Sequence, residues 1–125
     1  MSYGAYTRTQ NVTQDPRDVE FRLLGSVTGA LLAAKDQSDR RRVFDAVLWN
    51  QRVWDAFLVD LTHEDNRLPV ELKRRLVGLC LWVRNETDAI IDGRGDVDAL
   101  VAVNRNIMDG LRGTVAETAA RAAAG

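Results

Sequence analysis

Residues 39–61, DRRRVFDAVLWNQRVWDAFLVDL, decide the fold class of this chain. Apolar side chains recur here at the three- and four-residue spacing of an α-helix. One side of the helix collects Val43, Ala46, Val47, Asn50, Trp54, Phe57, Leu58 and Leu61. Leu48 and Val59 fall nearly opposite, so this helix is apolar on more than one side. We therefore expect residues 39–61 to form the central helix of the protein.

Three further helices are predicted around this stretch. Asp15-Pro16 starts the first, because Asp is a favoured N-cap and Pro is favoured at the first helical position; this helix is expected to end near Lys35. Pro69 opens the next helix, Gly93 ends it, and Asp96 caps the last one. Four helices of roughly 20 residues with short connections pack as antiparallel neighbours. The sequence therefore predicts an all-α protein, a small antiparallel bundle of about four helices.

The chain has 125 residues, which is the size of one domain. We expect a flexible, extended N-terminal arm over residues 1–14, a single helical domain over residues 15–115 and an alanine-rich C-terminal tail over residues 116–125. The core stripe of the first helix comprises Val19, Leu23, Val27, Ala30, Leu31 and Ala34. That of the third comprises Leu72, Leu76, Leu79, Cys80, Val83, Thr87, Ile90 and Ile91.

Charge and cysteine content narrow the function classes. Lys and Arg number 17 against 18 Asp and Glu, so the net charge is −1. This balance does not favour broad capture of polyanions, and we expect neither DNA nor a membrane surface as a partner. One cysteine, no apolar leader in the first ten residues and no long apolar run together predict a cytoplasmic protein.

The sequence offers little chemistry for catalysis. The one histidine, His63, lies in a charged loop, and Cys80 falls on the core stripe of the third predicted helix. Asp92, Asp96 and Asp98 resemble part of a calcium loop but lack its glycine and its distal glutamate. We therefore expect no enzyme activity, no metal site and no cofactor.

A partner-binding surface is the sharper hypothesis. Phe21, Gly25, Thr28 and Leu32 form a second stripe on the first helix and predict a shallow groove for a partner helix. The alternative is that the N-terminal arm or another helix covers this stripe. Trp49 and Trp82 lie at the edges of their stripes, where each is expected to be half exposed. The full candidate set is Tyr6, Phe21, Gly25, Thr28, Leu32, Leu48, Trp49 and Trp82.

Two further groups of polar residues have both a structural and a functional interpretation. Asn50 and Asn104 fall within apolar stripes, and buried amides need partners, so they bond each other or neighbouring backbone. The basic clusters at residues 40–42 and 73–75 are either solvated helix starts or contacts for RNA phosphates.

Short pieces spread over most of the chain carry a family resemblance. They are Ala5-Tyr6, Asp15-Pro16-Arg17, Leu48-Trp49-Asn50, Asn66-Arg67-Leu68-Pro69 and Asn104-Arg105-Asn106-Ile107. Their order and spacing resemble the FlaF family of flagellar biosynthesis regulators of alphaproteobacteria. The resemblance implies a cytoplasmic helical protein that acts on flagellin as a regulator or export chaperone, with FlbT as a companion regulator. It implies no catalytic residue.

The resemblance also suggests how binding would work. Flagellin termini are helical in the filament and disordered before assembly, and such segments fold on binding to an apolar groove. The leading hypothesis is a flagellin-binding chaperone that supports flagellin synthesis and export. The alternative is an RNA-binding post-transcriptional regulator of flagellin message that uses the two basic clusters.

Overall fold

A computed structural model describes residues 16–36 and 39–124 of the chain, with side chains for residues 19, 22–36 and 39–110. These residues form four α-helices and no strand: α2 (Pro16–Lys35), α3 (Arg40–Thr62), α4 (Val70–Ile91) and α5 (Val97–Ala124). The predicted all-α bundle is confirmed. The predicted arm over residues 1–14 lies outside the described residues. Helix α5 runs on through the predicted tail to Ala124.

The helix ends follow the local chemistry of the sequence. The Asp39 side chain caps α3 by accepting a hydrogen bond from the Arg41 amide at 3.0 Å, and Asp96 accepts one from the Asp98 amide at 2.9 Å. Pro69 is the N-cap residue of α4, whereas the sequence predicted it at the first helical position. Gly93 follows α4 with φ 82°, a left-handed conformation that glycine adopts without a steric penalty.

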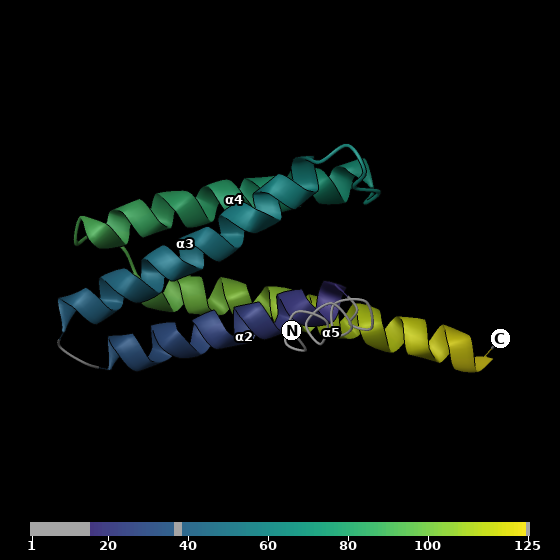
Figure 1. The fold of residues 1–125 in the computed structure, drawn as a ribbon, viewed down its shortest axis with the longest axis horizontal. Helices are drawn as coiled ribbons and strands as arrows, with labels where there is room; N and C mark the ends of the chain where they lie inside the picture. Colours follow the sequence, from purple (N-terminus) through teal and green to yellow (C-terminus); the bar gives the residue numbers. More distant parts are fainter. Residues whose placement is uncertain (1–15, 37–38, 125) are drawn as a thin grey trace, which may run out of the picture.

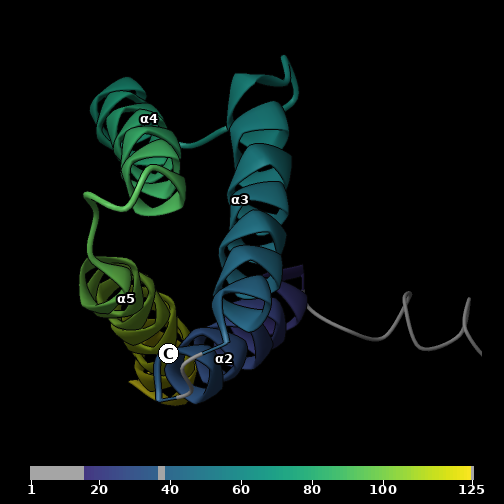
Figure 2. The same cartoon turned by 90° about the vertical axis from the view of Figure 1, so that its left-hand side faces the viewer.

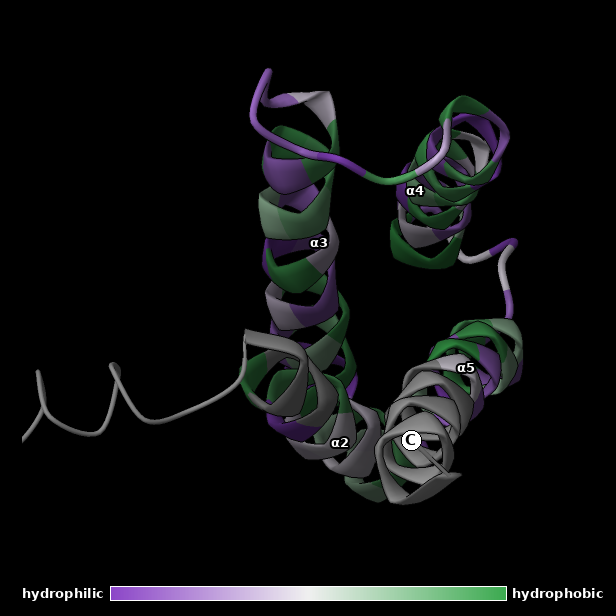
Figure 3. Cartoon of the chain, turned by 90° about the vertical axis from the view of Figure 1, so that its right-hand side faces the viewer, coloured by the Kyte–Doolittle hydropathy of each residue, from purple (hydrophilic) through white to green (hydrophobic). Residues whose placement is uncertain are grey.

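Each helix runs antiparallel to the one before it (Figure 1). Helix α2 packs against both α3 and α5, and α4 packs against α3, whereas α4 and α5 contact each other little beyond their connection. Viewed from either end, the bundle has α2 and α5 side by side, and α3 diverges from this pair. Helix α4 lies beside α3, away from the α2–α5 pair (Figures 2 and 3). The helices are therefore paired in the order α4, α3, α2, α5.

The core draws side chains from all four helices. Its fully buried apolar members are Leu24, Val27, Leu31, Val47, Val83 and Leu100. The α3 stripe is confirmed, with Ala46, Val47, Asn50, Val53, Trp54 and Leu61 buried. Val19 and Leu23 were predicted as core residues of α2, but they are 38% and 44% exposed, so this part of the prediction is wrong. Leu72 of α4 is likewise exposed and not a core residue.

The reason for the exposure on α2 is the path of α3. The two helices lie close together at the connection over residues 36–39, and α3 then diverges from α2 toward its own C-terminus (Figure 1). Val19 and Leu23 lie in the N-terminal half of α2, where α3 has moved away. The side of α2 that faces α3 is thus covered only near the connection.

Candidate partner-binding surface

The second stripe of α2 is covered by α5 at Thr28, whereas Gly25 is exposed. Thr28 is only 5% exposed, and its hydroxyl accepts a hydrogen bond from Asn104 Nδ2 at 3.1 Å. A Cβ built on Gly25 would lie 4.0 Å from Met108 Sδ of α5. Leu32 is half-buried. The sequence left open whether this stripe is a groove for a partner or is covered by the N-terminal arm or another helix. At Thr28 another helix, α5, covers it, so Thr28 is not a surface residue.

Asn104 is the centre of a buried polar cluster. Besides Thr28, its amide nitrogen donates to Asn50 Oδ1 at 2.8 Å, and its oxygen accepts from Trp54 Nε1 at 2.9 Å. Asn50 and Asn104 are both fully buried, and of the two alternatives for these amides the structure shows the bond between them. Asn50 Nδ2 has no hydrogen-bond partner. The cluster ties α5 to α2 and α3, and it has no access to a ligand.

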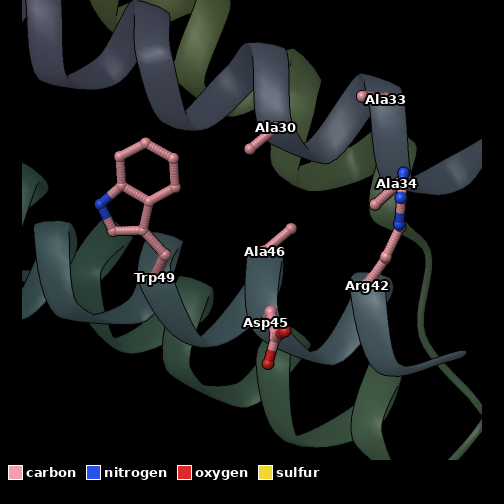
Figure 4. A pocket seen from close by; sticks show the side chains of 7 residues that line it. All are labelled: Ala30, Ala33, Ala34, Arg42, Asp45, Ala46 and Trp49. Carbon is pink, nitrogen blue, oxygen red and sulfur yellow. The ribbon is translucent and has the colours of Figure 1, made fainter.

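A pocket opens on the other side of α2, against the N-terminal half of α3 (Figure 4). Its volume is about 290 Å³, and its lining is Ala30, Ala33, Ala34, Arg42, Asp45, Ala46 and Trp49. Alanine methyl groups from both helices form the middle of the pocket, and the Trp49 indole closes one end (Figure 4). Helices α2 and α3 carry small side chains at this point, so the space between them is left open to a ligand group.

The apolar surface extends from this pocket along α2. Val19, Leu23 and Ala30 follow one another at spacings of four and seven, which places them on one face of the helix. Val19 and Leu23 are the exposed side chains that α3 leaves uncovered. We call the surface formed by Val19, Leu23, Ala30, Ala33, Ala34, Ala46 and Trp49 the α2–α3 seam.

Two charged side chains lie on the α3 edge of the pocket. Arg42 and Asp45 are exposed, and neither has an ion-pair or hydrogen-bond partner among the described residues. Arg42 lies at the end of the pocket opposite Trp49 (Figure 4). An apolar pocket with one free positive and one free negative group beside it suits a ligand that is itself amphipathic.

Of the remaining candidate residues, Leu48 and Trp82 are described by the structure and do not join this surface. Tyr6 and the side chain of Phe21 lie outside what the structure describes. Leu48 is exposed on the outer side of α3. Trp82 is 36% exposed, next to the exposed Leu81, on α4, a helix that does not adjoin α2. The structure therefore brings together Trp49 and the alanines of α2, and separates them from Trp82.

The two basic clusters are far apart. Residues 40–42 begin α3 and residues 73–75 lie in the first turns of α4, so the two clusters occupy opposite ends of the bundle (Figure 1). Lys73 Nζ donates to the Asn66 backbone oxygen, and Arg74 pairs with Glu71 at 3.2 Å. The clusters form no single positive surface.

Reactive groups are sparse in the part of the chain that the structure describes. It contains no group of three or more His, Cys, Asp or Glu side chains that could hold a metal ion. Cys80 is buried, and this burial raises the pKa of its thiol. Within the same residues, none of the helices has the length and apolar character needed to cross a membrane.

Comparison with known proteins identifies a family. The model of the family described as flagellar protein FlaF matches residues 2–111. This range includes the whole α2–α3 seam and the buried polar cluster, and it ends before the alanine-rich end of α5. No match was found among curated proteins or among solved structures.

Proposed function

Because the chain belongs to the FlaF family of flagellar proteins, we propose that it binds flagellin in the cytoplasm and supports flagellin synthesis and export as a chaperone. The observation that carries this proposal is the exposed apolar surface of the α2–α3 seam. Large apolar side chains that a small helical protein leaves exposed beside a pocket, such as Val19 and Leu23, are typical of an interaction site. A flagellin terminal segment that is disordered before assembly supplies a matching amphipathic helix.

The charge of the chain favours this partner over RNA. With a net charge of −1, the protein has no overall attraction for a polyanion. The basic residues that would contact RNA phosphates are split between the two ends of the bundle (Figure 1). Burial of apolar surface is therefore the expected source of affinity, and such binding depends weakly on salt.

Calorimetric titration with purified monomeric flagellin, at low and at high salt, tests the proposal. We expect binding at both salt concentrations with a negative heat-capacity change, the signature of apolar burial. A control variant carries alanine at Arg41, Arg74 and Arg75 and keeps Arg42, which lines the pocket.

The same control variant distinguishes flagellin binding from the alternative, RNA binding. Binding to flagellin message that falls steeply with salt and is lost in this variant would identify RNA as the ligand. No heat and no complex with flagellin at either salt concentration would overturn the proposed function.

A further inference from the structure

We propose that the outer face of α4 binds a second copy of this chain, so that two α4 helices pair antiparallel about Leu81. The inference does not depend on the proposed function, and it leaves the α2–α3 seam free. It is carried by the position of α4 in the bundle, by the apolar side chains exposed on this helix and by the distribution of charge along it.

Helix α4 packs on one side only. It contacts α3 and touches α5 little beyond their connection, and it lies at the edge of the bundle (Figure 2). Its buried residues Cys80, Val83 and Thr87 recur at helical spacing, so the opposite side of the helix is open. We call this open side the outer face of α4. It is formed by the exposed residues Val70, Arg74, Gly78, Leu81, Trp82, Asn85 and Asp88.

The middle of the outer face is apolar. Leu81 is 47% exposed and Trp82 36% exposed, side by side near the midpoint of the helix. Gly78 lies one turn earlier, and a Cβ built there would meet nothing within 4 Å. Glycine is disfavoured in a helix interior, and here it leaves the backbone open to a bulky side chain of another chain. The three residues therefore provide a projecting indole and a place to receive one.

The charges of α4 are divided between its two halves. Residues 70–80 contain three basic residues and one acidic residue, whereas residues 81–91 contain two acidic residues and one basic residue. Arg74 and Asp88 each lie seven residues from Leu81, on the same face two turns away. The Asp88 carboxylate has no hydrogen-bond or ion-pair partner among the described residues. Arg74 pairs with Glu71 at 3.2 Å, and its guanidinium has further donors.

This pattern is complementary to itself when two copies run antiparallel. With Leu81 at the two-fold axis, Arg74 lies opposite the partner's Asp88, and the symmetry makes this pair twice. The two Leu81 side chains meet at the axis, and Trp82 lies beside the partner's Gly78. A parallel pairing would instead place Arg74 against Arg74 and Asp88 against Asp88, where like charges repel. The charge along α4 therefore selects the antiparallel arrangement.

The size of the contact sets the expected strength. A standard interface buries about 800 Å² on each partner, and a contact between two single helices is smaller. We therefore expect a weak dimer whose population depends on protein concentration.

Charge reversal at the two ends of the pairing tests the inference. Arg74→Asp makes positions 74 and 88 both acidic, and Asp88→Arg makes both basic, so each variant alone places like charges opposite each other. An equimolar mixture of the two variants restores opposite charges at both symmetric contacts. Arg105→Asp, at an exposed position of α5, is the matched control for the change of charge. Circular dichroism verifies that every variant is folded.

Sedimentation velocity over a range of concentrations measures the dimer Kd. We expect each reversal to raise it about tenfold at low salt, the mixture to return to within about threefold of wild type, and Arg105→Asp to stay within about twofold. High salt should shrink the effect of the reversals because these charges are exposed. Leu81→Ala removes the apolar contact at the axis, so it should weaken the dimer at either salt concentration.

Three outcomes would overturn the inference. Wild type that stays monomeric at every concentration excludes self-association. A wild-type dimer that neither the reversals nor Leu81→Ala weaken forms through another surface. Reversals that weaken the dimer without recovery in the mixture exclude the antiparallel pairing of Arg74 with Asp88. None of these results bears on flagellin binding, which is measured separately.

Discussion

The buried polar cluster gives the sharpest prediction on stability. Asn104→Leu keeps the shape of the side chain but removes all three of its hydrogen bonds. The Trp54 N–H and the Asn50 amide are then left buried without a partner. The Thr28 hydroxyl can still bond to backbone one turn earlier. Each buried unpaired group costs about 1–3 kcal/mol, so we expect the free energy of unfolding to fall by about 3 kcal/mol.

Removing the second amide should restore much of this loss. Asn50 already has one amide hydrogen donor without a partner, so Asn50→Leu alone is expected to stay close to wild type. In the double variant Asn50→Leu, Asn104→Leu, only the Trp54 N–H is left unpaired, at a cost of about 1–2 kcal/mol. The double variant is therefore expected to be more stable than Asn104→Leu.

Urea unfolding followed by far-UV circular dichroism measures these differences without depending on the Trp54 environment. With a slope of about 1.5 kcal/mol per M, Asn104→Leu should lower the midpoint by about 2 M. Effects that add to within about 0.5 kcal/mol in the double variant would refute the reasoning, because independent sites are additive and coupled ones are not.

Two further predictions concern the α4–α5 turn and the cysteine. A Cβ on Gly95 would lie 2.6 Å from the Ile90 backbone nitrogen, so Gly95→Ala should lower the free energy of unfolding by about 1–3 kcal/mol, as measured by thermal unfolding. An unchanged melting temperature would contradict this close approach. Burial raises the pKa of the Cys80 thiol above 9.0, so the neutral form stabilises the fold below about pH 9 and that contribution is lost as pH rises further. Native protein at pH 8 should react with a thiol reagent far more slowly than protein in urea; equal rates would contradict the burial.

The sequence predicted the helices and the central role of α3 because both depend on local signals. The cap at Asp96 acts on the amide two residues later, and the α3 stripe requires only helical spacing. That Asn50 and Asn104 need partners also followed from the sequence, and the bond between them was one of the two alternatives it left open. Trp54 as the third partner was missed, although a buried indole N–H carries the same requirement.

The exposed part of the seam was missed for a different reason. A stripe identifies the apolar side of a helix, but the path of its neighbour determines how much of that side is covered. Val19 and Leu23 follow the same pattern as Val27 and Leu31, and only the divergence of α3 from α2 separates exposed from buried. Crossing geometry depends on how side-chain ridges of two helices interlock, which spacing in one sequence does not reveal. The alanines at 30, 33, 34 and 46 were a usable signal for the pocket, because small side chains on two facing helices leave the space between them unfilled.

The pairing of α2 with α5 has a consequence for how the chain folds during synthesis. Thr28 and Asn104 are 76 residues apart, whereas α3 and α4 are neighbours joined by a short connection. Closing a long loop costs more chain entropy than closing a short one, so we expect the α2–α3 and α3–α4 hairpins to form before α5 docks on α2. During synthesis, α2 leaves the ribosome before the other three helices. Its second packing partner, α5, is the last of the four helices to be synthesised. Over that interval, the nascent chain exposes on α2 the apolar side chains that α5 later covers.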